Sequence, residues 1–144
     1  MLRVVVGLAI LVSIFAATAL AQSLQEQKMC AKQAHVAFQY WKRGGKEEIT
    51  GSDDYKDHFN TRLKKCLVLI ESRGSLSGEY FNSALLMDAY ESRVFAGYSW
   101  SSRKGKKYWE VPPLVCQLMP ISEEKTECSS REEFDAFVAK YMEE

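Results

Sequence analysis

The stretch Leu63-Lys64-Lys65-Cys66-Leu67-Val68-Leu69-Ile70-Glu71-Ser72 decides the fold of this chain. At its centre, four consecutive apolar residues are preceded by two lysines and followed by a glutamate. A continuous apolar run this short, ended by charge and by Gly74, is typical of a strand buried on both faces. We therefore expect the central strand of a small antiparallel sheet, joined covalently to another element through Cys66.

Residues 1–21 have the pattern of a signal peptide. Arg3 supplies the positive start, residues 4–20 carry no charge, and Ala19-Leu20-Ala21 has the small-x-small form of a cleavage site. The alternative, an uncleaved anchor, is disfavoured because the apolar stretch is short for a membrane span. We expect cleavage before Gln22, export to the periplasm or the medium, one domain over residues 22–144, and no membrane contact after cleavage.

The charge balance argues against nucleic acid as a partner. Without Arg3, the exported chain holds 18 basic and 19 acidic residues, a formal charge of −1. Such a near-neutral chain gives no long-range attraction to an anionic polymer.

Four cysteines, Cys30, Cys66, Cys116 and Cys128, accompany this predicted export. An even number in an oxidising compartment predicts disulfides, and three pairings are open. We favour Cys30–Cys66, which would pin an N-terminal helix to the central strand, and Cys116–Cys128, which would close a short loop. The alternative, a metal site, lacks the C-x-x-C spacing, so we expect neither metal nor cofactor.

The chain begins its fold with a helix over residues 24–42, which Gly44-Gly45 ends. An apolar stripe at helical spacing predicts its buried face and comprises Cys30, Ala34, Ala37, Phe38 and Trp41. Residues 46–54 are polar and acidic, and we expect a loop there.

A meander of about four to five strands follows. The predicted strands cover residues 58–72, 80–87, 94–101, 108–111 and 114–119, with turns at 73–78, 88–93 and 103–107. In the third of them, Val94, Ala96, Tyr98 and Trp100 alternate with smaller residues and with Phe95, which predicts one large aromatic face.

The C-terminal segment predicts a second helix. Ser130 and Glu133 form a capping box. Phe134, Phe137, Val138 and Tyr141 recur at i, i+3, i+4 and i+7, so this stripe should pack on the sheet with Phe137 buried. The fold class is therefore α+β: N-terminal helix, antiparallel meander and C-terminal helix, in two layers.

Several strings together resemble small exported bacterial proteins of unknown function. They are residues 65–71, 88–91, 98–100 and 108–113, with Cys116, Cys128 and the helix start at Glu133-Phe134-Asp135. The resemblance implies bacterial origin and export, and it carries no activity or catalytic residue.

No set of residues matches a catalytic motif. His58 stands near Asp54 and Asp57, but no serine lies in a G-x-S-x-G turn that would make it a nucleophile, and His35 suits a helix surface. The acid pairs Glu47-Glu48 and Asp53-Asp54 are typical of a solvated loop. We therefore expect no enzyme, and a hydrolase ranks last.

The most informative surface is the predicted hairpin tip. Four cations are interleaved with aromatic residues there: Trp100, Arg103, Lys104, Lys106, Lys107, Tyr108 and Trp109. Cations beside aromatic rings can bind anionic or sugar-like groups through charge and stacking. The alternative is an ordinary solvated turn whose aromatic neighbours face the core.

These features lead to two hypotheses about function. The first is a non-enzymatic protein-binding or accessory module of the cell envelope, with another envelope protein as its partner. The alternative is a small-ligand carrier that holds its ligand between the aromatic sheet face and a helix. A cavity lined by Tyr98, Trp100 and Phe134 would favour the carrier, and a filled core would favour the module.

Overall fold

The computed structural model describes residues 24–43, 50–76, 78–121 and 124–143. The predicted signal peptide and the pair Glu47-Glu48 lie outside these residues. A helix covers residues 24–43. It is followed by β1 (Thr50–Asn60), β2 (Lys65–Leu76), β3 (Glu79–Asp88), β4 (Val94–Ser101), the 3-10 turn η1 (Tyr108–Glu110), β5 (Val115–Leu118), β6 (Thr126–Glu127) and α2 (Arg131–Met142).

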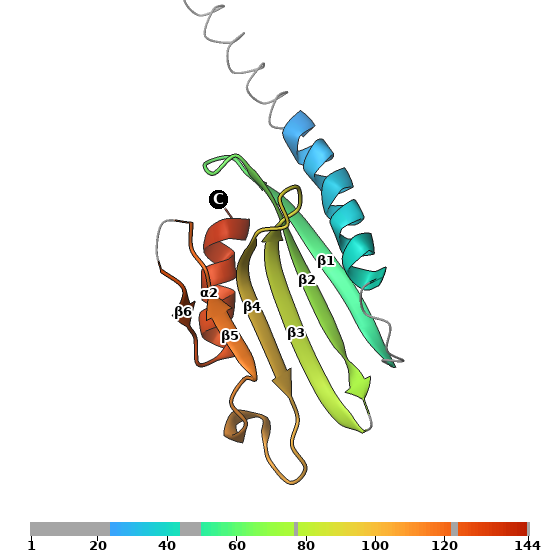
Figure 1. Ribbon diagram of the computed structural model, residues 1–144, viewed down its shortest axis with the longest axis vertical. Helices are drawn as coiled ribbons and strands as arrows, with labels where there is room; N and C mark the ends of the chain where they lie inside the picture. The colour runs from blue at the N-terminus through green and yellow to red at the C-terminus, as the bar shows by residue number, and fades with distance from the viewer. Residues whose placement is uncertain (1–23, 44–49, 77, 122–123, 144) are drawn as a thin grey trace, which may run out of the picture.

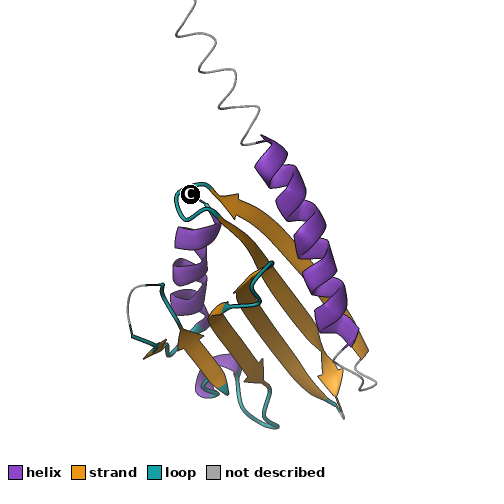
Figure 2. Ribbon diagram, turned by 45° about the horizontal axis from the view of Figure 1, so that its top comes forward, coloured by secondary structure: helices purple, strands orange, loops and turns teal. Residues whose placement is uncertain are grey.

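The strands form one antiparallel sheet in the order β1-β2-β3-β4-β5-β6. The N-terminal helix lies along the β1–β2 side of one face, and α2 lies on the other face (Figures 1 and 2). The predicted α+β class with a meander is confirmed, although the sheet has six strands rather than four to five. The expectation of two layers is wrong. The two helices pack on opposite faces of the sheet, so the domain has three layers.

Strand β2 explains this arrangement. Side chains alternate along a strand, so its apolar run supplies both faces. Cys66, Val68 and Ile70 pack in the core under the N-terminal helix, and Leu67 and Leu69 pack in the core under α2. All five are buried, so β2 needs a covering layer on each side.

The N-terminal helix is fastened to β2 by the Cys30–Cys66 disulfide. Ala34 and Phe38 continue the same buried stripe toward the sheet. The second bond joins Cys116 of β5 to Cys128, just before α2. Both favoured pairings are therefore confirmed.

Helix α2 starts at the predicted cap. The Ser130 hydroxyl accepts a hydrogen bond from the Glu133 backbone N–H, while the Glu133 carboxylate accepts from the N–H and hydroxyl of Ser129 rather than from Ser130. Phe134 and Val138 are buried on the sheet. Phe137 is only half-buried, which corrects the expectation that it is a core residue.

The prediction of a single strand over residues 58–72 is wrong, because the chain reverses direction at residues 61–64. Asn60 makes the turn, since its side-chain oxygen accepts the Leu63 N–H at 2.8 Å and Lys64 adopts a positive φ of 53°. Residues 50–54, predicted as loop, belong to β1. That strand is polar because it is the sheet edge, where charges prevent pairing with other chains.

Three further assignments are corrected. β2 continues through residues 73–76 of the predicted turn, and β3 begins directly after it, at Glu79. Residues 108–110 form η1 instead of a strand, because the Glu110 carboxylate accepts the Lys107 N–H and closes a tight turn. The two-residue strand β6 was not predicted.

The predicted face of β4 is confirmed for Ala96, Tyr98 and Trp100, whereas Val94 lies on the other side of the sheet, beside the N-terminal helix. Ala96, Tyr98 and Trp100 face α2, and an irregularity opposite Leu86 and Met87 brings Phe95 into the same core.

We predict that Phe134→Ala destabilises the protein by about 3–5 kcal/mol, because it empties a fully buried ring site. Phe137→Ala should cost less, about 1–2 kcal/mol, because that ring is half-buried. Denaturant unfolding of both variants measures the difference. Equal losses would contradict the packing described for α2.

The cap of α2 predicts a pH dependence. Hydrogen bonds from the Ser129 backbone N–H, and next from its hydroxyl, lower the pKa of the Glu133 carboxyl. Its contribution to stability is therefore complete above the unfolded-state pKa of about 4.3 and is lost as the pH falls through the lower folded-state pKa. The free energy of unfolding of Glu133→Gln should fall less steeply between pH 6 and pH 3 than that of the unmodified protein. Parallel pH profiles would contradict this role.

Candidate binding surfaces

The predicted binding surface is a protruding tip between β4 and β5. We call Trp100, Arg103, Lys104, Lys106, Lys107, Tyr108 and Trp109 "the tip". The four cations of the tip are all exposed. Trp109 is 75% exposed and Tyr108 46% exposed, so the structure contradicts the alternative in which these two rings face the core.

Local hydrogen bonds fix the shape of the tip. The Lys106 N–H donates to the Arg103 carbonyl, and Gly105 takes the positive φ of 76° that this turn needs. Lys107 is the N-cap of η1, and its ammonium lies 5.1 Å from the centre of the Trp109 ring. The exposed indole is therefore held beside a positive charge.

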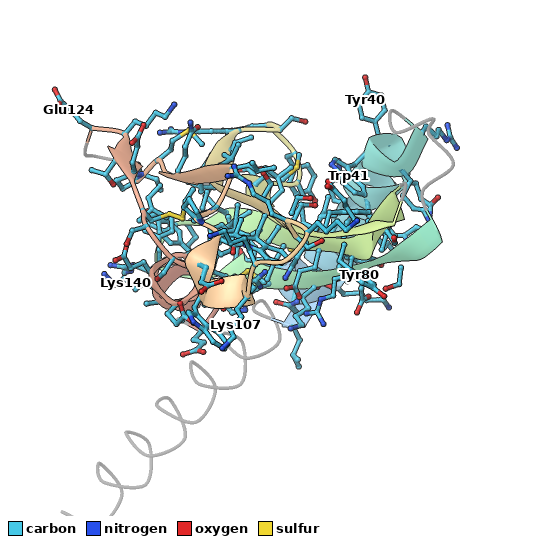
Figure 3. The ribbon with its side chains drawn as sticks, turned by 90° about the horizontal axis from the view of Figure 1, so that it is seen from below. Tyr40, Trp41, Tyr80, Lys107, Glu124 and Lys140 are labelled. Atoms are coloured by element: carbon cyan, nitrogen blue, oxygen red, sulfur yellow. A yellow bond between two sulfur atoms is a disulfide. The ribbon has the colours of Figure 1, made fainter. Side chains whose placement is uncertain are left out.

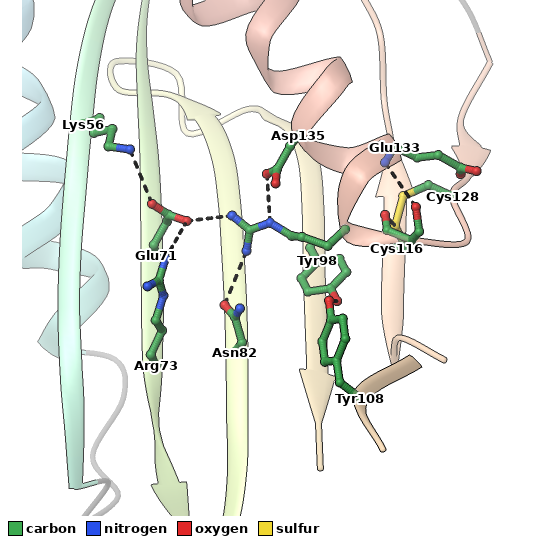
Figure 4. Close-up of polar contacts among 12 residues, drawn as sticks. Lys56, Glu71, Arg73, Asn82, Tyr98, Tyr108, Cys116, Cys128, Glu133 and Asp135 are labelled. Carbon is green, nitrogen blue, oxygen red and sulfur yellow. Dashed lines mark hydrogen bonds and ion pairs between the residues drawn. A yellow bond between two sulfur atoms is a disulfide. The ribbon is translucent and has the colours of Figure 1, made fainter. Parts of the chain in front are cut away.

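The base of the tip is an aromatic wall. The Trp100 indole N–H donates to the Val111 carbonyl at 2.9 Å, and the Trp100 and Tyr108 rings are 4.8 Å apart. The Tyr98 and Tyr108 hydroxyls are 3.3 Å apart (Figure 4). Burial, followed by this hydrogen bond, raises the pKa of Tyr98 far above its ordinary value.

A hollow of about 360 Å³ separates this wall from the start of α2. Its lining combines the aromatic wall with Pro112, Pro113 and residues 129–132. Phe134 is not part of the lining, because it is fully buried with its ring 5.7 Å from that of Tyr98. The space between Tyr98 and Phe134, predicted for a carrier's ligand, is thus filled by their side chains, and Tyr98 and Trp100 line the open surface hollow instead.

Arg131, at the other side of the hollow, is already paired. Its guanidinium contacts Glu71 at 2.7 Å, Asp135 at 2.8 Å and Asn82 at 3.4 Å (Figure 4). Lys56 and Arg73 also pair with Glu71. This network ties α2 to β2 and β3, and each of its three cations is paired with a carboxylate of the fold.

His35 contacts a tyrosine rather than one of the acids considered above. The His35 ring nitrogen Nδ1 lies 3.2 Å from the Tyr55 hydroxyl. His58 and Asp57 are neighbours on β1 and therefore face opposite sides of the sheet. Asp53 accepts from Ser72, and Asp54 from the Tyr55 N–H. Within the ranges that the structure describes, no group of three His, Cys, Asp or Glu side chains is arranged to hold a metal.

A second surface was not predicted from the sequence. An apolar groove of about 570 Å³ runs between the N-terminal helix and the sheet. We call it "the helix groove". Its helix side is formed by Gln33, Val36, Ala37, Tyr40 and Trp41, and its sheet side by Leu85, Met87, Ala89, Tyr90, Ser92 and Val94. Figure 3 shows Tyr40 and Trp41 on the opposite side of the sheet from Lys140 of α2.

A sequence signal for the helix groove was present. Met29, Val36 and Tyr40 are apolar, lie beside the predicted buried stripe and are 48%, 57% and 81% exposed. They widen the apolar arc of the helix beyond what its own sheet contacts use.

Comparisons with known proteins gave no match to a family model, a curated protein or a solved structure. Among the helices in the described ranges, none is long and apolar enough to span a membrane. Any function must therefore be inferred from the two surfaces themselves.

The tip generates a spectroscopic prediction. Four cations should concentrate iodide around the exposed Trp109 indole, so Trp109→Phe should remove the largest part of the iodide-quenchable fluorescence. Added salt should weaken the iodide effect but not quenching by neutral acrylamide. Trp41→Phe is the control, because that indole lies in the helix groove. A larger loss of iodide quenching in the control would contradict the described exposure.

Proposed function

We propose that this small disulfide-stabilised domain is a non-enzymatic exported accessory module, which binds another protein of the cell envelope through its tip. The observation that carries the proposal is the largely exposed Trp109 indole beside Lys107, on a loop with three further cations. Trp, Tyr and Arg are the side chains that dominate binding energy at protein interfaces.

The rigidity of the tip supports this proposal. Trp100 is held by a hydrogen bond to Val111 and by its contact with Tyr108, so the base of the tip is ordered before a partner arrives. A surface already ordered loses less conformational entropy on binding. The Cys116–Cys128 bond anchors β5, which follows the tip, to the segment before α2.

The charge of the tip defines the partner's chemistry. Arg103, Lys104, Lys106 and Lys107 outnumber the single carboxylate of Glu110 in this loop. A partner surface with clustered carboxylates and an apolar recess for an indole would complement it. The filled space between Tyr98 and Phe134 favours this module over the carrier hypothesis.

Native mass spectrometry of the protein purified from its own source tests the proposal. We expect a chain that begins at Gln22, contains both disulfides and carries a stoichiometric protein partner. Combined Arg103→Glu, Lys104→Glu and Lys106→Glu should abolish that complex. Lys107 is left unchanged because a carboxylate at this position would repel the Glu110 carboxylate, which accepts the Lys107 N–H and closes η1.

The matched control reverses three exposed lysines elsewhere, Lys28, Lys32 and Lys140, and changes the net charge equally. This control should keep the partner. A complex that survives reversal of the tip charges, or one lost equally in both variants, would refute binding through the tip. A chain that retains Met1 would refute export.

A further inference from the structure

The hollow between the tip and α2 combines aromatic rings with carboxylates. Tyr98, Trp100 and Tyr108 form its wall. Glu110 of η1 and Glu132, from the first turn of α2, also line it. Rings and acids thus meet at one place, although they come from β4, η1 and α2.

Both carboxylates stand outside the ion pairs that hold this fold together. Glu110 accepts the Lys107 N–H through Oε2, so it meets a neutral donor there. Glu132 is exposed. Within the described ranges, the carboxylates that form ion pairs are Asp53, Glu71, Asp88, Glu91 and Asp135. The negative charge of Glu110 and Glu132 is therefore available to a ligand in the hollow.

Arg131 is the cationic residue of the lining, and it is already paired elsewhere. Its guanidinium is held by Glu71 and Asp135, and neither of these acids lines the hollow. The guanidinium carbon also lies 5.4 Å from the centre of the Tyr98 ring. Arg131 thus shows that a ring of this wall accepts a guanidinium group beside it.

The negative charge of Glu132 acts on the aromatic wall. The pKa of the Tyr98 phenol is raised mainly by burial and then by its hydrogen bond with Tyr108, toward which it points (Figure 4). The charge of Arg131 lowers this pKa, and the charge of Glu132 raises it. Aromatic rings also attract cations to their faces. Carboxylates and rings therefore both favour a positively charged ligand.

The openness of the hollow favours a side chain delivered by a larger partner. A free small ligand usually buries most of its surface in its site, which an open hollow does not provide. A side chain of a protein gains further binding energy from the rest of its interface. Arginine suits the hollow better than lysine, because its planar guanidinium stacks on aromatic rings and pairs with carboxylates through two hydrogen bonds.

We propose that the hollow binds the side chain of an arginine presented by the protein that contacts the tip. The guanidinium stacks on the aromatic wall and pairs with Glu132 and Glu110. This inference rests on the proposed function, since the same partner provides the arginine. That partner must then present carboxylates to the tip and an arginine beside them to the hollow, which fixes its orientation.

A second copy of the chain fits this role poorly. It would most readily offer Arg103, which stands on the protruding tip together with three lysines. The hollow lies at the base of the same kind of tip, because Trp100 and Tyr108 belong to both. Insertion of Arg103 would therefore bring one group of four cations close to another, and like charges repel at such short range.

The experiment follows the indole N–H signals of the oxidised protein by NMR during titration with Nα-acetyl-arginine amide. The chain holds three tryptophans. Trp100 and Trp109 line the hollow, and Trp41 in the helix groove is the internal reference. The corresponding citrulline amide has nearly the same shape without the charge and is the matched ligand. Tetramethylammonium, methyl glucoside and inorganic phosphate are the further probes.

We expect the arginine probe to shift the signals of Trp100 and Trp109 saturably and to leave that of Trp41 unchanged, with a much weaker effect of the citrulline probe. Glu132→Gln should weaken arginine binding about threefold, as loss of one exposed ion pair would. Added salt should weaken it too. Glu143→Gln is the matched control, since it removes the same charge from an exposed position at the other end of α2, and it should bind like the unmodified protein.

Native mass spectrometry of the complex links the hollow to the partner. Combined Glu110→Gln and Glu132→Gln should lower the fraction of the chain that carries the partner, whereas Glu143→Gln should not. A glutamine at position 110 can still accept the Lys107 N–H, so η1 is kept. The NMR titration needs no partner, and the variant with reversed tip charges should still bind the arginine probe. Failure at the hollow is thereby distinguished from failure at the tip.

Five outcomes would overturn the proposal. Equal shifts by the arginine and citrulline probes would show that charge is not recognised. Saturable binding of the glucoside or of phosphate in place of arginine would assign the hollow to a sugar or an anion. Tighter binding of tetramethylammonium than of arginine would indicate a free organic cation. A concentration-dependent dimer abolished by Arg103→Glu would indicate a second copy. Undiminished capture of the partner by the variant that lacks both carboxylates would separate the hollow from the interface.

Discussion

The rest of the structure depends on the burial of one strand from both sides. Val68 and Ile70 of β2 point to one face, and Leu67 and Leu69 to the other. No single layer can cover such a strand, because alternate side chains leave the sheet in opposite directions. The two helices are the two covers, and the long β1–β2–β3 ladder between them supplies the rigid middle layer.

The covers are held in different ways. The N-terminal helix is joined covalently to β2 by Cys30–Cys66, at the start of the apolar run. Helix α2 is positioned by Cys116–Cys128 at its start and by Arg131, which reaches Glu71 of β2. The pair Arg131–Glu71 is mostly shielded from solvent, so loss of one partner would leave a poorly solvated charge. The orientation of each cover is therefore set by specific bonds as well as by apolar contact.

Two small helices cannot cover six strands completely, and the uncovered parts differ in character. Near β1 and β2, the uncovered face carries ion pairs around Glu71. Near β4 and β5, the other face is uncharged. The tip adds a third surface, where the chain leaves β4 and the prolines at 112 and 113 keep the segment from joining the ladder. Incomplete cover thus creates chemically distinct surfaces on one small scaffold.

Local sequence determined most elements of this fold. The buried run of β2, the stripe at Cys30 and Phe38 and the cap at Ser130 were readable, because each depends on spacing within one segment. The two cysteine pairs were inferred from the even number of cysteines and from the elements that carry them. Local sequence also located the tip, through the cations and aromatic residues between Trp100 and Trp109. Strand β1 was missed, since its acidic residues disfavour a strand unless it is an edge partly covered by a helix.

Only the tertiary structure decided which surfaces remain open. The sheet face on which each helix packs depends on contacts between segments far apart in sequence, which no local pattern reveals. The presence of a third layer depends on the same contacts. The apolar groove that Val36 and Leu85 both line follows from that packing. Spacing along a chain fixes the faces of an element, but contact between elements far apart in sequence determines which face meets solvent.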